Sequence, residues 1–378
     1  MELVLIISTI LITLHILLPL SYYVYMRRIA IKKPWNITLD EKYEPKVTLI
    51  IATYNESNVI SKRLENLKKL DYPEEKLEII GVDSASTDGT VEIAKKYISC
   101  NNFPFKITFL EQEKRMGKAK ALNFALKYAT GEIIATSDAD SYWEPSALRQ
   151  AMPFLASSQV GALTGREVFI NIDKNALTLA EGAYRDIYNV LRVGESKIGS
   201  TFIFQGELSL YKRESFDKFE DEKGSDDTGT VINIIAKGYR SICVPNAVFY
   251  DVAPSTWLGR MVVKTRRAQH LLFALTKAVK LQFQGKLKIP AITTYMNFYL
   301  HAINPILGIV LLISIIYALW KYALCLSLPL LMIILFFLSI TKLRIFIVSY
   351  LTGNMALLLA IVRCVKGDKQ TVWKKIER

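Results

Sequence analysis

The sequence predicts an α/β domain with a mostly parallel central sheet, joined at both ends to helices that cross a membrane. Between about residues 45 and 250, short β-branched runs alternate with runs of helical spacing, which is typical of a parallel sheet covered by helices on both faces. Outside this region lie long uncharged apolar runs, so that 51% of the residues are hydrophobic although 22% are charged. The four cysteines lie far apart and indicate neither a zinc site nor a disulfide framework.

An apolar run near the N-terminus, Leu3–Met26, carries no charge and is long enough to cross the hydrocarbon core of a bilayer. A glutamate precedes the run and Arg27 and Arg28 follow it, whereas a cleaved signal peptide begins with basic residues. We therefore expect a retained transmembrane anchor over residues 1–26 and a basic juxtamembrane linker over residues 27–44. The positive flank predicts that the following domain lies in the cytoplasm.

Four strands and three helices are expected to alternate in the first half of the central domain. The predicted strands are 47–52, 77–82, 107–110 and 132–136, and the predicted helices are 59–70, 91–97 and 119–128. Ligands of such sheets bind beyond the carboxyl ends of the strands. The polar residues that follow these strands are therefore candidates for a functional site.

Three of the predicted strands end in polar or acidic residues: Thr53-Tyr54-Asn55-Glu56, Asp83 and Asp138-Ala139-Asp140. Any single one of these segments is also explained as turn-capping acids at a strand end. Their joint placement at one sheet edge favours a site of hard oxygen ligands, which suits Mg²⁺ or Mn²⁺ with a diphosphate completing the shell. The chain has neither the Walker loop nor the G-x-G-x-x-G turn of other nucleotide-binding folds.

These residues, in this order and spacing, resemble the nucleotide-sugar domain of glycosyltransferase family 2. The motifs that carry the resemblance are the three strand ends, Ser86-Thr87-Asp88-Gly89-Thr90, Arg115-x-Gly117-Lys118-Ala119, Asn123, Gln205-Gly206-Glu207, Ser225-Asp226-Asp227, Gly238-Tyr239-Arg240 with Pro245, and Lys264-Thr265-Arg266-Arg267-Ala268. The resemblance covers about residues 45–290, with membrane helices on both sides as in cellulose, hyaluronan and poly-N-acetylglucosamine synthases and in ceramide glucosyltransferase. It implies a GT-A domain over residues 45–255 and basic interfacial helices over residues 256–288.

The resemblance implies a nucleotide-sugar site made of Thr53, Tyr54, Glu56, Asp83, Arg115, Lys118, Asp138, Lys264 and Arg267. In it, Asp83 accepts the imide hydrogen of the base, and Asp138 and Asp140 hold Mg²⁺ or Mn²⁺, with Asp140 as the direct ligand. The cation offsets the charge that develops on the departing nucleoside diphosphate. A solvated helix start is the alternative explanation for Arg115 and Lys118.

Asp227 matches the final acid of the family's T-E-D motif, so the resemblance implies that it is the general base of an inverting transfer. We expect the preceding acid, Asp226, to raise the pKa of Asp227 by like-charge repulsion. The alternative is that both acids cap a helix over residues 231–237. The expected acceptor side comprises Gln205, Gly206, Glu207 and Asp226.

The chain departs from the Q-x-x-R-W motif of processive family members. Lys264 and Arg267 align with the motif's Gln and Arg, but Ala268 stands where the Trp would pack beside the acceptor sugar. The Arg can still hold a diphosphate in a bidentate fork. Without the aromatic platform, we expect transfer of one or a few sugars rather than polymer synthesis.

Three further apolar runs follow the domain, at residues 289–320, 322–341 and 345–362, and a basic tail occupies residues 363–378. Three crossings would place the basic tail outside, against the positive-inside rule, whereas two would keep it in the cytoplasm. The last run is the weakest candidate, and residues 289–362 are left with two or three transmembrane helices. The stretch Arg260–Lys288 has eight basic and no acidic residues, which predicts either an interfacial helix or an ordinary basic surface helix.

The predicted function is that of an inverting, metal-dependent glycosyltransferase in the plasma membrane, with its catalytic domain in the cytoplasm. Its expected partners are a UDP- or GDP-sugar, a membrane lipid or lipid-linked acceptor, and the membrane. Nucleic acid is not expected, because the basic clusters adjoin apolar runs. The alternatives are a processive polysaccharide synthase and a membrane-tethered nucleotide-binding regulator without catalysis.

Overall fold

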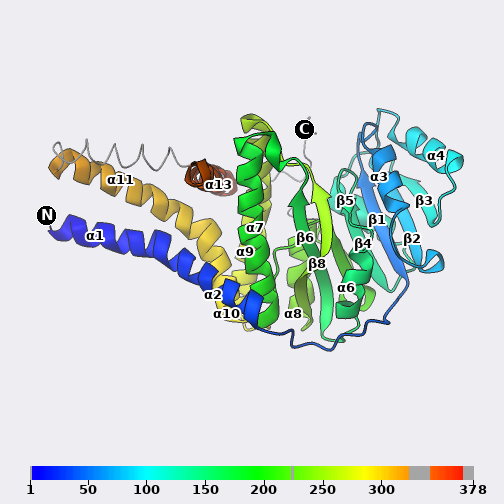
Figure 1. Cartoon of the computed structure of the whole chain (residues 1–378), viewed down its shortest axis with the longest axis horizontal. Helices are drawn as coiled ribbons and strands as arrows, with labels where there is room; N and C mark the ends of the chain where they lie inside the picture. Colours follow the sequence, from blue (N-terminus) through cyan, green and yellow to red (C-terminus); the bar gives the residue numbers. More distant parts are fainter. Residues whose placement is uncertain (1, 223–224, 323–340, 369–378) are drawn as a thin grey trace.

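The computed structural model describes residues 2–222, 225–322 and 341–368, and its two parts are an α/β domain and a set of long helices that project from one side of it (Figure 1). The sheet runs in the order β3-β2-β1-β4-β7-β6-β8-β5. The strands are β1 (Val47–Thr53), β2 (Leu77–Asp83), β3 (Lys106–Glu111), β4 (Ile133–Asp138), β5 (Tyr142–Trp143), β6 (Val160–Phe169), β7 (Ser209–Lys212) and β8 (Arg240–Asp251).

The sheet is mixed rather than uniformly parallel. Strands β3, β2, β1 and β4 pair in parallel, as the sequence predicts, and β6 pairs in parallel with β8. The short strand β7 runs antiparallel to both β4 and β6, and β5 runs antiparallel to β8. Because β7 reverses the direction twice, β6 and β8 point the same way as β4. The carboxyl ends of β1, β2, β4, β6 and β8 therefore meet at one edge.

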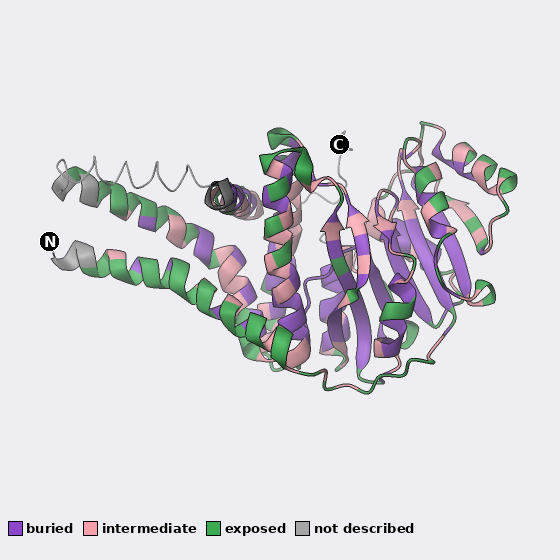
Figure 2. Cartoon of the chain, in the orientation of Figure 1, coloured by how far each residue is buried: buried purple, intermediate pink, exposed green. Residues whose placement is uncertain are grey.

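Helices cover both faces of the sheet because its strands are apolar on both sides. Along β1, Val47, Leu49 and Ile51 pack on one face and Ile50 on the other, which is the period of two that a strand imposes. Apolar residues of α3 (Ile60–Leu67), α4 (Thr90–Cys100) and α6 (Ala147–Leu155) contribute to the first of these cores, and those of α5 (Lys118–Leu126), α8 (Asp226–Ala236) and α9 (Trp257–Phe283) to the second. Figure 2 shows the central strands mostly buried, whereas the edge strand β3 is partly exposed.

Among the residues that the structure describes, three helices are long and apolar enough to cross a membrane: Ile6–Lys32, Ala291–Tyr317 and Ile347–Val365. They belong to α1 (Glu2–Ile12) with α2 (Leu18–Lys32), to α10 (Ala291–Phe298) with α11 (Asn304–Tyr322), and to α13 (Thr341–Val365), with π-helical segments joining the first two pairs. Many of their apolar side chains are exposed (Figure 2), which is expected of a surface that faces lipid.

These helices agree with three of the four predicted apolar runs, and the run over residues 322–341 lies almost wholly outside the described residues. The N-terminal helix continues to Lys32, so the bases at residues 27, 28 and 32 of the predicted juxtamembrane linker lie on its last turns. Inside the bundle, His15 contacts both the carbonyl and the side-chain oxygen of Asn304 at 3.0 and 2.9 Å and also contacts Tyr350, which ties three helices together.

The helix α7 (Ala176–Ile198) connects the two parts. It packs along β8 on one side and against α2 and α13 on the other, and it stands beside α9 between the sheet and the projecting helices (Figure 1). Its N-terminus is fixed by a capping box, in which the side chain of Asn175 accepts from the backbone of Thr178 and the side chain of Thr178 accepts from Asn175. Polar residues of α7 therefore lie between the sheet edge and the apolar helices.

Candidate functional site

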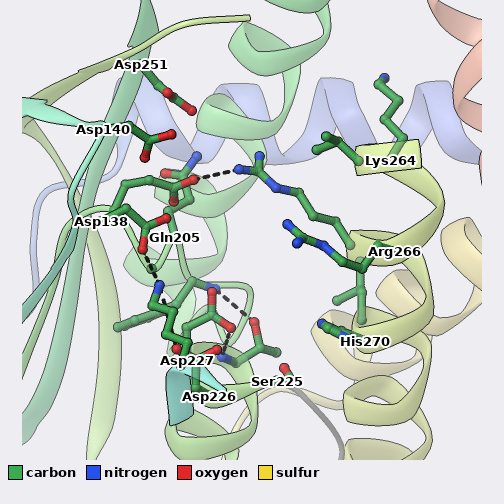
Figure 3. A pocket seen from close by; sticks show the side chains of 18 of the residues that line it. Asp138, Asp140, Gln205, Ser225, Asp226, Asp227, Asp251, Lys264, Arg266 and His270 are labelled. Atoms are coloured by element: carbon green, nitrogen blue, oxygen red, sulfur yellow. Dashed lines mark hydrogen bonds and ion pairs between the residues drawn. The ribbon is translucent and has the colours of Figure 1, made fainter. Parts of the chain in front are cut away.

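A cavity of about 1720 Å³ lies along the carboxyl edge of the sheet and continues between α7, α9 and α13. Its sheet side is lined by Asp138 at the end of β4, by Asp140 in the following turn, and by Asp226 and Asp227 of α8. Its far side is lined by α9, where Figure 3 shows Lys264, Arg266 and His270 on one helix across the cavity from the aspartates. The cavity thus joins the strand ends to the apolar helices.

Lys118 links the two pairs of aspartates. Its ammonium group contacts the carboxylate of Asp138 and lies 3.7 Å from Oδ2 of Asp226. Desolvation alone would lower the pKa of Lys118, but the charges of Asp138 and Asp226 outweigh it and raise the pKa above its ordinary value. A Cβ atom at Gly206 would lie 2.7 Å from Nζ of Lys118, so the glycine leaves the space in which the lysine reaches the acids.

Asp227 is the titratable group best suited to accept a proton. Desolvation raises its pKa to about 7, and the neighbouring charge of Asp226 contributes in the same direction, as the sequence predicts. Both acids lie in the first turn of α8, which begins at Asp226 and not at residue 231 as expected. Ser225 forms no side-chain capping bond to the helix, but Oδ1 of Asp227 accepts a hydrogen bond from the backbone of Thr228 at 2.5 Å, so a helix-end role for the acidic pair stays an alternative to a catalytic one.

The loop that carries Gln205, Gly206 and Glu207 is held against the end of β4 by its own backbone. The carbonyl oxygen of Glu207 accepts hydrogen bonds from Oγ of Ser137 at 2.9 Å and from Nε1 of Trp143 at 2.8 Å. This anchoring turns the side chain of Glu207 into the cavity, where Arg267 donates to its Oε1 at 2.8 Å. Arg267 is thereby placed on the carboxylate side of the cavity.

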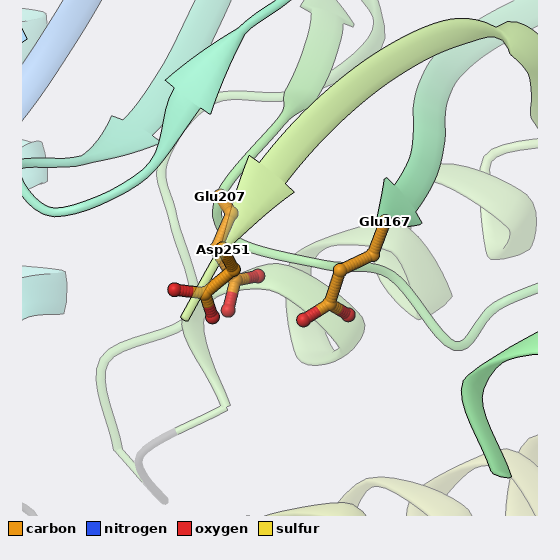
Figure 4. Close-up of side chains that lie close together, drawn as sticks. All are labelled: Glu167, Glu207 and Asp251. Atoms are coloured by element: carbon orange, nitrogen blue, oxygen red, sulfur yellow. The ribbon is translucent and has the colours of Figure 1, made fainter. Parts of the chain in front are cut away.

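Two further acids complete the sheet edge, and the sequence analysis missed them. Glu167 near the end of β6 and Asp251 at the end of β8 converge with Glu207 so that one carboxylate oxygen of each lies within 4.8 Å of the others (Figure 4). Arg185 binds Glu167 at 2.7 Å, and Gln205 donates to the same carboxylate. Burial raises the pKa of Glu167, while the charge of Arg185 opposes this shift.

These two acids could have been predicted as site residues from the sheet topology. Asp251 ends a strand as Asp83 and Asp138 do, and the strand-end rule would have selected it once β8 was recognised. Arg267 faces this cluster, and although burial would lower its pKa, the charges of Glu207, Glu167 and Asp251 raise it. Arginines contact Glu167 and Glu207 of this cluster, and Lys118 likewise contacts Asp138, so both groups of carboxylates are candidates for holding Mg²⁺ or Mn²⁺.

The residues expected to bind the nucleoside lie at the same edge but mostly outside the lining of this cavity. Thr53 and Asp83 stand side by side in the register of β1 and β2, and Oγ1 of Thr53 donates to Asp83 at 2.9 Å. Ser86 donates to the same carboxylate through its backbone at 2.8 Å and its hydroxyl at 2.6 Å. A carboxylate has about four acceptor positions, so Asp83 retains capacity for one more donor.

The loops after β1 and β2 are locked together. Asn55 and Ala85 both adopt positive φ, of 56° and 59°, which is uncommon for residues other than glycine. The backbone of Asn55 donates to Ser86 at 2.8 Å, and its side chain accepts from the backbone of Thr87 at 2.9 Å. The guanidinium carbon of Arg115 lies 3.7 Å from the centre of the Tyr54 ring. These contacts form a rigid wall beside the cavity.

Most of the predicted site residues come together in the cavity. Those that line it are Glu56, Arg115, Lys118, Asp138, Asp140, Gln205, Gly206, Glu207, Asp226, Asp227, Lys264 and Arg267. Thr53, Tyr54 and Asp83 adjoin it without lining it. Lys264 binds Oε1 of Glu181 on α7 at 2.7 Å and lies 4.1 Å from the ring of Tyr184, which places it toward α7.

The chain shares its architecture and sequence with known glycosyltransferases. The sequence profile described as glycosyl transferase family 2 matches residues 48–219. The mannosyltransferase PcManGT from Pyrobaculum calidifontis, solved in complex with GDP-Man and Mn²⁺, is 34% identical, superposes with a TM-score of 0.82, and is matched over 97% of this chain and 99% of that chain.

Two curated bacterial proteins are more distant. The probable glycosyltransferase YdaM of Bacillus subtilis is 25% identical over 65% of this chain and 59% of its own length. The poly-beta-1,6-N-acetyl-D-glucosamine synthase of Staphylococcus aureus is 26% identical over 66% of this chain and 60% of its own length, so the chain spans about three fifths of these two relatives. The profile match and the full-length similarity to the mannosyltransferase together establish that the chain belongs to glycosyltransferase family 2.

Proposed function

We propose that this glycosyltransferase transfers a sugar from a UDP- or GDP-sugar to a lipid or lipid-linked acceptor at the membrane, with inversion at the anomeric carbon. The observation that carries the proposal is the shape of the cavity. It places the paired acids Asp138 and Asp140, the raised-pKa carboxylate of Asp227 and the apolar helix α13 along one continuous space. Donor and acceptor can therefore meet without leaving the protein.

Asp138 and Asp140 would hold Mg²⁺ or Mn²⁺ together with the donor diphosphate, and the cation supplies Lewis-acid stabilisation of the leaving group. The use of Mn²⁺ is supported by the donor set of two carboxylates and by the similar mannosyltransferase, which was solved with GDP-Man and Mn²⁺. Arg267 adds a guanidinium fork on the same side of the cavity, where it can contact the departing diphosphate. Lys118 balances the charges of Asp138 and Asp226.

Asp227 would remove the proton from the acceptor hydroxyl as that oxygen attacks the anomeric carbon on the face opposite to the diphosphate. A base of pKa about 7 suits this task, because about half of it is ionised at neutral pH and it is basic enough to take a proton from a hydroxyl in the transition state. A single displacement by one base inverts the anomeric configuration. Neither a glycosyl-enzyme nor a second nucleophile is required.

The membrane arrangement supports a cytoplasmic catalytic domain. Arg27, Arg28 and Lys32 lie on the last turns of α2, at the end next to the α/β domain (Figure 1). Bases at this end of a spanning helix favour the cytoplasmic side. The domain would then use cytoplasmic nucleotide sugars and meet its acceptor at the inner surface of the membrane.

A transfer assay on the purified full-length chain tests the proposal. The protein in detergent is given labelled GDP-mannose first, then other GDP- and UDP-sugars, with Mn²⁺, Mg²⁺ or EDTA and a membrane lipid extract as acceptor. We expect metal-dependent labelling of lipid with inverted configuration, measured by chromatography and NMR. Labelling that is unchanged in EDTA, or that retains configuration, would refute the proposed chemistry.

A processive polysaccharide synthase is the second candidate, favoured by the similarity to the poly-beta-1,6-N-acetyl-D-glucosamine synthase. The small side chain of Ala268 on the cavity wall, where processive members carry Trp, favours short products instead. Product length in the same assay separates the two. A ladder of long polymers would replace our single-transfer proposal, and a protein that binds donors but transfers no sugar would be the nucleotide-binding regulator.

A further inference from the structure

A group of basic side chains lies on the membrane side of the cavity, apart from the aspartates. Arg185 and Arg192 come from α7, and Arg260 and Lys264 come from the facing part of α9. All four line the cavity although little of them is exposed. The residue exposure is 0% for Arg260 and 4% for Arg192, and the side-chain exposure is 11% for Arg185 and 14% for Lys264.

The charge of this basic group is only partly balanced. Oε1 of Glu181 accepts a hydrogen bond from Nε of Arg260 and forms an ion pair with Nζ of Lys264, both at 2.7 Å. Glu167 balances Arg185 at 2.7 Å. Four buried cations therefore share two carboxylates in direct contact, and an excess of buried positive charge is costly unless an anion joins it.

Unpaired donors point to the same conclusion. Within the described residues, Nη1 and Nη2 of Arg260 and Nε and Nη1 of Arg192 are buried and have no hydrogen-bond partner. Burial and the nearby charge of Arg185 lower the pKa of Arg192, as expected where positive charges crowd together. A buried guanidinium that lacks acceptors is rare in a folded protein. Oxyanions in the cavity between α7 and α9 would supply the acceptors that these donors lack.

The apolar lining next to the basic group indicates that the anion is attached to a hydrocarbon chain. The cavity continues past this basic group to Gly353, Ala356 and Leu357 of α13, a helix long and apolar enough to cross a membrane. Tyr184 bridges the two zones: its ring lies 4.1 Å from Nζ of Lys264 and 4.0 Å from the position of a Cβ atom at Gly353. A ligand at this place would hold its charge among the arginines and its hydrocarbon against α13.

We propose that Arg192 and Arg260, with Arg185 and Lys264, bind the phosphate or diphosphate of a lipid-linked acceptor whose hydrocarbon chain extends along α13 toward the membrane. This inference rests on the proposed function and specifies its acceptor as a lipid phosphate ester. Paired guanidinium groups suit phosphate because their N–H donors match two oxygens at once. The proposed site would be separate from the donor diphosphate beside Asp138 and Asp140, and it assigns to the acceptor Lys264, which the sequence analysis expected in the nucleotide-sugar site.

Ligand binding to the full-length chain in detergent tests the site. Farnesyl diphosphate serves as the probe, farnesol as the uncharged match, and phosphatidylglycerol as a bilayer lipid with a phosphate headgroup. We expect farnesyl diphosphate to raise the melting temperature, to bind at least roughly tenfold more tightly than farnesol, and to resist displacement by phosphatidylglycerol. Equal binding of the diphosphate and the alcohol would overturn the inference, and full displacement by phosphatidylglycerol would reassign the site to a bilayer lipid.

Variants of α7 assign the effect to these residues. Arg192→Gln should weaken farnesyl diphosphate binding roughly tenfold or more, whereas Lys197→Gln, on the same helix but bound to the carbonyl of Ala30, should leave it unchanged. Arg192→Lys keeps the charge, so its affinity for farnesyl diphosphate should lie between those of the two Gln variants. If Arg192→Gln does not fold, the affinity of Arg192→Lys tests the site. Unchanged affinity in a folded Arg192 variant would refute the site.

Donor binding is measured with GDP and UDP plus Mn²⁺ on the same samples. It distinguishes a failure of the lipid phosphate site from a failure of the proposed function. Intact donor binding with no preference for farnesyl diphosphate over farnesol would refute the lipid phosphate site alone. Loss of donor binding in the wild-type protein would refute the proposed function itself.

Discussion

The two ends of the cavity differ in how the chain builds them. The donor end is assembled from strand termini, where Asp138 and Asp140 follow a buried strand directly and are brought to the edge by local sequence. The membrane end is assembled from α7, α9 and α13, whose polar groups meet only after distant segments have packed. We infer that the proposed donor site can be recognised from short sequence motifs, whereas the proposed acceptor site depends on tertiary packing.

A large effect, exceeded only by that of replacing Asp227, is expected at the donor end. Asp140→Asn removes a hard anionic ligand, so transfer should fall by roughly a hundredfold or more, together with the Mn²⁺-dependent stabilisation by nucleotide. Transfer rates and melting temperatures with and without Mn²⁺ measure both effects. Asp173→Asn, the same change at an exposed acid, is the control. Full activity of the Asp140 variant would remove Asp140 from the metal site.

At the membrane end, Glu181→Gln should lower stability and strengthen anion binding. Removing one partner of a buried ion pair costs about 3–5 kcal/mol, because Arg260 and Lys264 would lose their shared carboxylate. Thermal unfolding in detergent gives the first effect, and titration with farnesyl diphosphate gives the second. Glu220→Gln, which breaks the more exposed pair with Lys277, should cost less and leave affinity unchanged. Weaker anion binding in the Glu181 variant would contradict the charge argument.

Gly206→Ala tests the junction between the two ends. The added methyl would lie 2.7 Å from Nζ of Lys118, and the flexible lysine must then move away from Asp138. We expect roughly a tenfold loss of kcat with little loss of donor binding, since misplacement of a charged group near the reacting atoms acts mainly on the transition state. Steady-state kinetics decide this, and an unchanged kcat would show that the lysine position is not critical.

The smallest expected change is a shift in pH dependence. Asp227 must be ionised to act as a base, so kcat/KM should rise with pH through about 7. Asp226→Asn removes the neighbouring negative charge, lowers the pKa of Asp227, and should move the profile to lower pH.

The free energy of unfolding should depend on pH in the opposite sense. Because folding raises the pKa of the Asp227 carboxyl, this group destabilises the protein as the pH rises from about 4 to about 7. Asp227→Asn should abolish this part of the pH dependence of unfolding.

The first half of the α/β domain could be predicted closely from the sequence. The strands over residues 47–52, 77–82, 107–110 and 132–136 agree with β1 to β4 within two residues, because buried parallel strands are short apolar runs with turn residues at their ends. The second half was less predictable. Strand β7 has only four residues and pairs with β4 and β6, from which it is distant in the chain, so no local pattern reveals it.

The same limit explains which parts of the site were missed. Glu167 lies within a strand and becomes a site residue only because β6 pairs beside β8. On α7, Glu181, Arg185, Tyr188 and Arg192 recur at intervals of three and four residues, a helical stripe that the sequence displays. From the sequence alone, this stripe is indistinguishable from a solvent-exposed helix face. It is recognised as part of a site only when α9 and α13 are known to pack opposite to it.

The most direct test of the account is Asp227→Asn compared with Asp217→Asn, which makes the same change at an exposed acid that pairs with Lys237. Sugar transfer and donor binding are measured on each purified protein. We predict that the Asp227 variant loses about 10²- to 10⁴-fold in transfer rate but binds the nucleotide sugar and Mn²⁺ as the wild type does. The Asp217 variant should be unaffected in both measurements. Transfer by the Asp227 variant at the wild-type rate would contradict the central claim that this carboxylate is the base in a shared cavity.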